Sequence, residues 1–123
     1  MLKGFENHSD KPLYRWKLLE NGTVTKVGPI TEYKIQPMGL GRIRYEFLFP
    51  IKNTRGYLHE HDLDVFTHSR IFSFDPDDSH ALEIIKQALV VKRDAFKNEY
   101  EYAQGLLDRF IIDNYGGNYE KLS

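Results

Sequence analysis

The stretch that decides the fold is residues 75–112, which read DPDDSHALEIIKQALVVKRDAFKNEYEYAQGLLDRFII. Its first residues favour a helix start, because Asp75 can cap the first turn and Pro76 suits the first helical position. Asp77 and Asp78 then place negative charge at the positive end of the helix dipole. After Pro76 the stretch contains no further proline. We therefore predict one long α-helix over residues 75–113.

An apolar stripe runs along this predicted helix. Ile85, Tyr100 and Leu107 widen a face on which an apolar residue recurs at every seventh position. The repeating positions are Leu82, Leu89, Phe96, Ala103 and Phe110. At about 1.5 Å per residue the helix would be about 55 Å long, whereas a globular chain of this size is about 35 Å across. The helix must therefore extend beyond the rest of the fold, break, or pack against a second copy.

Lys92 and Arg93 divide the stripe into two parts. Before them, Leu82, Ile85 and Leu89 are expected to cover a sheet. Beyond them the stripe needs another partner, and we expect a homodimer, because closed two-fold pairing is the commonest way to bury such a surface. Folding back after a break is the alternative. The residues predicted to pack in the dimer are Phe96, Tyr100, Ala103, Leu107 and Phe110.

Residues 12–74 alternate between apolar and polar side chains, as half-buried strands do. Asn21-Gly22 predicts a hairpin with a type I′ turn, in which both central residues need a positive φ. Gly28-Pro29 predicts a bulge or a break in the following strand, because proline cannot donate to the ladder. The clearest strand is RIRYEFLF, residues 42–49. We predict an antiparallel sheet of five or six short strands.

The whole pattern predicts an α+β fold in which this sheet is followed by one long C-terminal helix. With 123 residues the chain fits a single domain. We divide it into a flexible arm (1–11), the sheet (12–74), the helix (75–113) and a tail (114–123).

Composition limits the classes of function. The chain has 0 Cys, so disulfides, thiol nucleophiles and cysteine-ligated zinc are excluded. It contains neither a signal-peptide pattern nor an apolar run long enough to span a membrane. We expect a protein of the cytoplasm that binds no membrane and needs no cofactor.

The charges are unevenly distributed along the chain. Residues 1–58 carry ten Lys or Arg against five Asp or Glu, whereas residues 59–123 carry seven against thirteen. If the strands of the first half are neighbours, their polar side forms a basic patch that could contact phosphates or an acidic protein. An ordinary solvated sheet face is the alternative. The residues of this predicted basic sheet face are Arg15, Lys17, Lys34, Arg42 and Arg44.

Catalytic patterns are weak in this sequence. His59, His61 and Asp64 are of types that bind divalent metals, but no paired motif supplies further ligands, and a solvated polar loop is the alternative. The sequence lacks the GxSxG pattern of serine hydrolases. We therefore expect a protein that is not an enzyme. A metal-dependent hydrolase is the least favoured of the functional hypotheses.

The order of segments resembles that of small accessory proteins from phages and prophages of Gram-positive bacteria. The resemblance covers residues 56–112, where the strand RIFSF is followed by DPDDSHALEIIKQAL and a long helix rich in Lys, Glu and Tyr. It implies an interaction protein that binds host or defence machinery, such as an anti-CRISPR-type inhibitor. We expect inhibition or modulation of a host nucleoprotein complex, and direct nucleic-acid binding through the basic sheet face is the alternative.

Overall fold

The computed structural model describes residues 4–51 and 54–116 and confirms the predicted α+β class. The chain divides into two compact units, Met1–Lys86 and Gln87–Ser123. We call the first the β unit and residues 87–116 the distal segment. The predicted tail beyond residue 116 lies outside the described residues.

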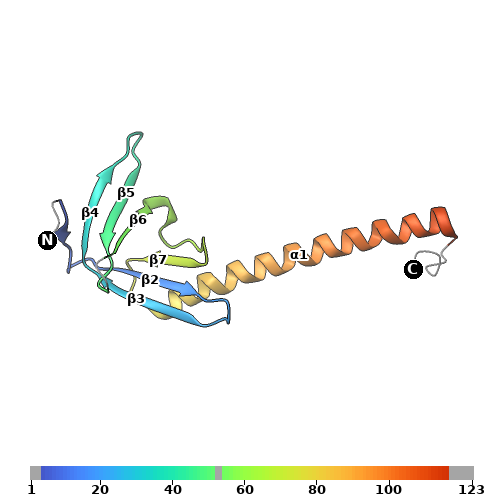
Figure 1. Ribbon diagram of the computed structural model, residues 1–123, viewed down its shortest axis with the longest axis horizontal. Coiled ribbons are helices and arrows are strands. Elements are labelled where there is room, and N and C mark those ends of the chain that lie inside the picture. Colours follow the sequence, from blue (N-terminus) through green and yellow to red (C-terminus); the bar gives the residue numbers. More distant parts are fainter. Residues whose placement is uncertain (1–3, 52–53, 117–123) are drawn as a thin grey trace. The chain divides into compact units, whose positions relative to one another are not determined.

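The described residues of the β unit form seven strands in two antiparallel sheets, where we predicted one sheet of five or six strands (Figure 1). The four-stranded sheet has the order β1-β4-β5-β6, with bounds Glu6–Asn7, Glu32–Pro37, Ile43–Leu48 and Arg55–His59. The three-stranded sheet has the order β3-β2-β7, with bounds Val24–Ile30, Leu13–Leu18 and Arg70–Ser73. A short 3-10 helix, η1 (Glu60–Asp62), follows β6. Only Thr31 separates β3 from β4, so the chain passes directly from one sheet to the other.

The first described residues differ from the predicted flexible arm. Glu6 and Asn7 form β1 and pair with Tyr33 and Glu32 of β4. Phe5 is buried. Residues 5–7 therefore belong to the β unit, because a buried ring and a strand ladder hold them there.

The predicted hairpin between β2 and β3 is confirmed, but its turn differs from type I′. Gly22 has a φ of +87°, whereas Asn21 is not among the described residues with positive φ. The Asn21 side-chain oxygen accepts a hydrogen bond from the Thr23 amide at 2.9 Å. Leu19 to Thr23 thus form a longer loop that the asparagine side chain stabilises.

The predicted irregularity at Gly28-Pro29 is a bulge in β3. Leu13 pairs with Ile30 and Arg15 with Val27, so β3 has one residue more than β2 across this interval. A Cβ on Gly28, whose φ is +149°, would fall on the Tyr14 ring. Glycine is therefore required where the bulged strand approaches β2.

The core lies on both faces of the three-stranded sheet. On one face, residues of both sheets pack together: Leu13, Ile30, Tyr33, Tyr45, Phe47, Leu58 and Phe72. On the other face, Trp16 and Ile71 pack against Ala81 and Ile85 from the first turns of the C-terminal helix. Leu13 and Trp16 are three residues apart on β2 and therefore lie on opposite faces, because successive side chains of a strand alternate between its two faces.

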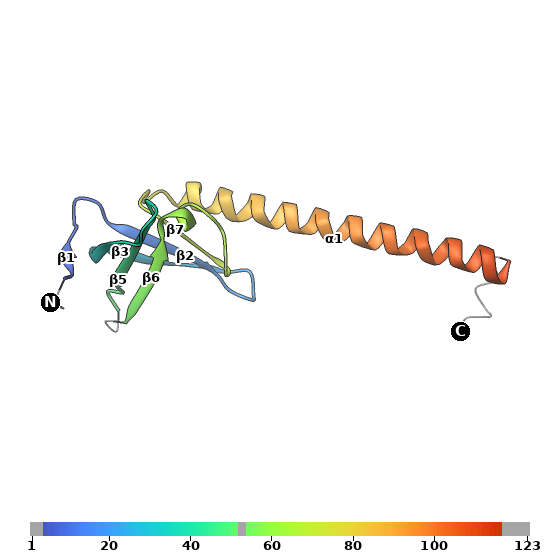
Figure 2. The ribbon, with the colours of Figure 1, turned by 90° about the horizontal axis from the view of Figure 1, so that it is seen from above.

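The C-terminal helix, α1, runs without a break from Asp78 to Tyr115 (Figure 2). Its cap is Asp77 rather than the predicted Asp75, because the Asp77 carboxylate accepts hydrogen bonds from the Ser79 amide (3.0 Å) and hydroxyl (2.7 Å). Asp75 instead accepts a hydrogen bond from the Asp77 amide at 2.9 Å. The helix therefore begins three residues later than predicted.

The face that α1 buries in the β unit also differs from the prediction. Ala81 and Ile85 are buried, whereas Leu82, which we expected to cover the sheet, is 45% exposed. Leu89 is also exposed and belongs to the distal segment. The small Ala81 allows close approach to the sheet, and this choice cannot be read from hydrophobicity alone.

Candidate interaction surfaces

The predicted basic sheet face is not one surface. Arg15 and Lys17 lie on β2 of the three-stranded sheet, whereas Lys34 and Arg44 lie on β4 and β5 of the four-stranded sheet. Arg42 lies in the turn before β5. The structure therefore separates the five residues into two groups, because β2 is not a neighbour of β4 or β5.

Lys34 and Arg44 already have partners within the β unit. The Lys34 ammonium lies 3.5 Å from the buried carboxylate of Glu46. The Arg44 guanidinium donates to the Gln36 side-chain oxygen at 2.9 Å and stacks on the Tyr57 ring at 4.7 Å. Their charges are engaged in holding β4, β5 and β6 together, which leaves them less suited to an external ligand.

A different basic cluster forms on the three-stranded sheet. Arg15 and Lys17 point to one side of β2, and Arg70 of β7 pairs directly with Lys17 across the ladder. In the described residues no ion pair joins these three cations to an acid. We call Arg15, Lys17 and Arg70 the basic cluster.

Arg15 is the most constrained member of the basic cluster. Its guanidinium stacks on the Phe49 ring at 4.8 Å, and its Nε atom is buried without a hydrogen-bond partner among the described residues. Burial lowers the pKa of Arg15, and the positive charge of Arg70 lowers it further. An anion beside these groups would offset both effects.

A groove of about 270 Å³ lies next to the basic cluster. Arg70 lines it, together with two aromatic rings and several polar side chains. The other lining residues are Tyr57, Leu58, His59, Asp62, Val65, Thr67, His68 and Phe72. Sequence reasoning missed Arg70 because its position opposite Lys17 depends on a pairing between strands more than 50 residues apart.

The weak metal candidates do not converge. His59 and His61 stack ring on ring, with centroids 5.3 Å apart. Asp64 instead accepts hydrogen bonds from the Ser73 hydroxyl (2.5 Å) and from the His80 ring (2.9 Å). Among the described residues, no group of three His, Asp or Glu side chains could hold a metal ion.

The contacts among Ser73, Asp64 and His80 do not form a nucleophilic triad. In such a triad the histidine lies between the serine and the acid and takes the serine proton. Here the acid lies in the middle, and the buried Ser73 hydroxyl donates to it. The network therefore joins the loop after η1 to β7 and α1, which is a structural role.

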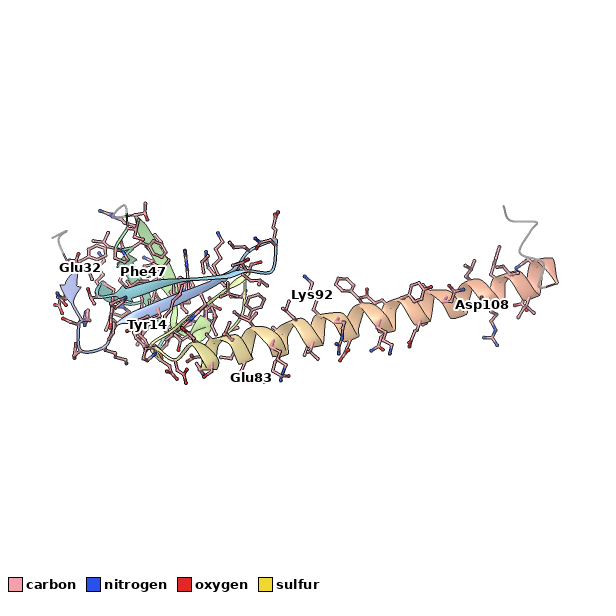
Figure 3. The ribbon with its side chains drawn as sticks, turned by 90° about the horizontal axis from the view of Figure 1, so that it is seen from below. Tyr14, Glu32, Phe47, Glu83, Lys92 and Asp108 are labelled. Carbon is pink, nitrogen blue, oxygen red and sulfur yellow. The ribbon has the colours of Figure 1, made fainter. Side chains whose placement is uncertain are left out.

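The distal segment carries several exposed apolar side chains. Figure 3 draws the side chains of this part of α1, with Lys92 and Asp108 labelled. Phe96 is 59% exposed and Tyr100 is 69% exposed. The helical period of 3.6 residues places the predicted packing residues and one further leucine, Leu89, within one face. We call this set the apolar stripe: Leu89, Phe96, Tyr100, Ala103, Leu107 and Phe110.

Other exposed apolar residues lie outside the apolar stripe. Tyr102 is 71% exposed and stands about 200° around the helix from Tyr100, since each residue turns the helix by about 100°. Val91 is similarly exposed and lies on the side of Tyr102. Tyr100 and Tyr102 therefore differ in the face they occupy, but hardly in residue type or exposure.

No protein-family model, curated protein or solved structure matches this chain. Within the described residues, no helix is both long enough and apolar enough to cross a membrane.

Proposed function

We propose that this chain is a non-enzymatic interaction protein that acts as a dimer and inhibits or modulates a host nucleoprotein or defence complex. The observation that supports the proposal most is the apolar stripe of the distal segment. The stripe extends over about 20 residues of one helix face, from Leu89 to Phe110, and its large side chains are exposed in the single chain.

The hydrophobic effect favours the burial of the apolar stripe against another surface. Each Å² of apolar surface removed from water contributes about 25 cal/mol, so the burial of several Leu, Phe and Tyr side chains offsets a substantial part of the cost of association. A stripe of this length on a regular helix fits a second helix better than it fits a small-molecule ligand.

The proposal is tested by a matched pair of substitutions, Tyr100→Glu and Tyr102→Glu. A charge in the apolar stripe should convert the dimer to a monomer in sedimentation equilibrium, whereas the same change at Tyr102 should leave the dimer intact. A wild-type protein that sediments as a monomer, or equal effects of the two substitutions, would contradict the dimer.

The target of the dimer is tested by affinity capture from host lysate, with and without nuclease. A protein inhibitor should retain its partner after nuclease treatment, since its contacts are with protein. Loss of the captured material after nuclease would instead favour the alternative function.

The alternative is direct nucleic-acid binding through the basic cluster. Among the described residues, no ion pair joins the three cations of the basic cluster to an acid. One of these cations, Arg70, lines a groove together with the exposed ring of Tyr57, and phosphates and bases use such groups. The Lys17→Glu plus Arg70→Glu variant should then abolish a salt-dependent gel shift. Arg42→Glu, in the turn before β5, is the control and should have little effect.

A further inference from the structure

We propose that two copies of the chain pair through their distal segments in antiparallel orientation, with Tyr100 of each copy facing Ala103 of the other. This inference rests on the self-association in the proposed function and specifies its geometry. It draws on two features of the distal segment: the distribution of its charges and the order of large and small residues along the apolar stripe.

The charges of the distal segment separate into two halves of opposite sign. Residues 87–98 carry three cations and one acid, whereas residues 99–116 carry one cation and four acids, so the net charges are +2 and −3. A parallel pair would place each half beside its like-charged copy. An antiparallel pair places the basic half of one helix along the acidic half of the other, which is favourable both for these charges and for the two helix dipoles.

The heptad positions point in the same direction. Arg93 lies seven residues before Tyr100 and therefore occupies the same heptad position. In a parallel pair each residue at the contact between the helices meets its own copy, so Arg93 would face Arg93 and Ala103 would face Ala103. The first contact brings two positive charges together. The second leaves a gap between two small side chains beside the bulky Tyr100 pair. A parallel seam is therefore poorly matched in both charge and size.

One antiparallel register removes both conflicts. When Tyr100 faces Ala103 of the second copy, a large residue meets a small one in two layers related by symmetry. Phe96 then faces Leu107, and Arg93 faces Phe110, where a guanidinium can lie on an aromatic ring. On the flank, Lys92 comes near Asp113 of the second copy, which pairs opposite charges.

The same register uses the whole distal segment. Because Tyr100 faces Ala103, Gln87 faces Gly116 of the second copy, which directly follows Tyr115, the last residue of α1. A shift by one heptad in either direction would leave one turn or more at each end outside the pair and would separate Tyr100 from Ala103. The register with the greatest overlap is therefore also the one with matched side chains.

The orientation is tested by spin labels on the full-length protein. The chain has 0 Cys, so a single introduced cysteine carries the only label. Val91→Cys and Tyr102→Cys are suitable because both positions are exposed and lie outside the apolar stripe. In the proposed register the two Val91 labels lie about 30 Å apart along the helix axes, whereas the two Tyr102 labels lie at nearly the same height.

Three results of the pulsed dipolar measurement have distinct meanings. A short Tyr102 distance together with a Val91 distance of about 30 Å supports the antiparallel register. Short distances at both positions indicate a parallel pair, which overturns this inference but keeps the proposed self-association. If neither position shows dipolar coupling, the labelled protein behaves like the monomeric Tyr100→Glu control. This result overturns both the antiparallel register and the proposed self-association.

The register itself has its own test in the same data. A shift by one heptad changes the Val91 distance by about 10 Å, because seven residues rise about 10 Å along the axis. A Val91 distance that differs from the expected value by this amount would overturn the pairing of Tyr100 with Ala103, even in an antiparallel dimer.

Discussion

The indole Nε1 of Trp16 donates a hydrogen bond to the Asp78 carboxylate at 3.0 Å, and this contact joins β2 to the first residue of α1. The Lys26 ammonium completes the contact, because it lies 2.8 Å from the same carboxylate oxygen and 5.1 Å from the centre of the Trp16 ring. It also donates to the Pro76 carbonyl at 2.9 Å. The start of the long helix is thus fixed by residues of the first hairpin.

Replacing Trp16 by Phe should lower the stability of the β unit. The substitution removes the hydrogen bond to Asp78 and part of a ring that is 2% exposed, so we expect a loss of about 1–3 kcal/mol in the free energy of unfolding. Denaturant unfolding followed by circular dichroism measures it.

Asp78→Ala should also lower the unfolding midpoint, because it removes the same hydrogen bond from the other side. Asp94→Ala, in the distal segment, is the control and should leave the midpoint of the β unit unchanged. Trp16 is the only tryptophan, so its fluorescence reports the loss of this contact directly. An unchanged midpoint for both Trp16→Phe and Asp78→Ala would contradict the role of this contact.

The contact between His80 and Asp64 should make stability depend on pH. The hydrogen bond to Asp64 raises the pKa of His80 above 6.5, and the negative charges of Asp64, Asp75 and Asp77 raise it further. Because the folded-state pKa is raised, the stabilisation is fully present below pH 6.5 and is lost as the pH rises through the folded-state pKa.

Thermal unfolding of wild type and His80→Gln measures this effect. The difference between their midpoints should be larger at about pH 5.5 than at about pH 9, since only the protonated ring forms the ion pair. Asp64→Asn should reduce the same difference, and asparagine tolerates the positive φ of position 64. A difference that does not change with pH would argue against the ion pair.

Two glycines should respond to alanine substitution in opposite directions. A Cβ on Gly56 would fall on the buried ring of Phe47, so Gly56→Ala should destabilise the β unit by about 1–3 kcal/mol. A Cβ on Gly105 meets nothing within 4 Å among the described atoms, and Gly105 lies within α1.

Gly105→Ala should therefore stabilise the distal helix by about 1 kcal/mol, which is the difference in helix propensity. Unfolding curves and the helical signal in circular dichroism distinguish the two effects. A loss of helicity in Gly105→Ala would show that this position needs glycine for a contact absent from the single chain.

The charges of the distal segment should control which copies associate. Lys92→Glu plus Lys97→Glu makes both halves acidic, and Glu99→Lys plus Asp113→Lys makes both halves basic. Each variant alone should associate more weakly than wild type at low salt, because like charges meet in either orientation. An equimolar mixture should restore association as a heterodimer.

Sedimentation of each variant and of the mixture measures this. High salt should reduce the differences, since screening weakens the interaction of exposed charges. If the mixture associates as weakly as each variant alone, the distal segments of the two copies do not face each other.

The sequence allowed prediction of the elements that depend on local chemistry. The heptad of apolar residues from Leu82 to Phe110 predicts an unbroken helix, and the structure has one from Asp78 to Tyr115. Asn21-Gly22 predicts a hairpin, which is present, and Gly28-Pro29 predicts a bulge or a break, of which the structure has the bulge. These signals are local because propensities and turn preferences act within a few residues.

The arrangement of the cations could not be predicted in this way. Lys34 and Arg44 alternate with apolar residues as Arg15 and Lys17 do, yet they belong to a different sheet. The partner of Lys17 is Arg70, whose position depends on the pairing of β2 with β7. Which helical residues cover the sheet was equally undetermined, since Ala81 is buried and Leu82 exposed.

By itself, the sequence determined the α+β class, the long helix and the apolar stripe, because each follows from the period of side chains along one segment. Only the tertiary structure decided that the strands form two sheets, that Asp78 meets Trp16 and Lys26, and that Arg15, Lys17 and Arg70 gather on one face. These contacts join segments far apart in the chain. Their free energy depends on the shape and charge of both surfaces, which no single segment contains.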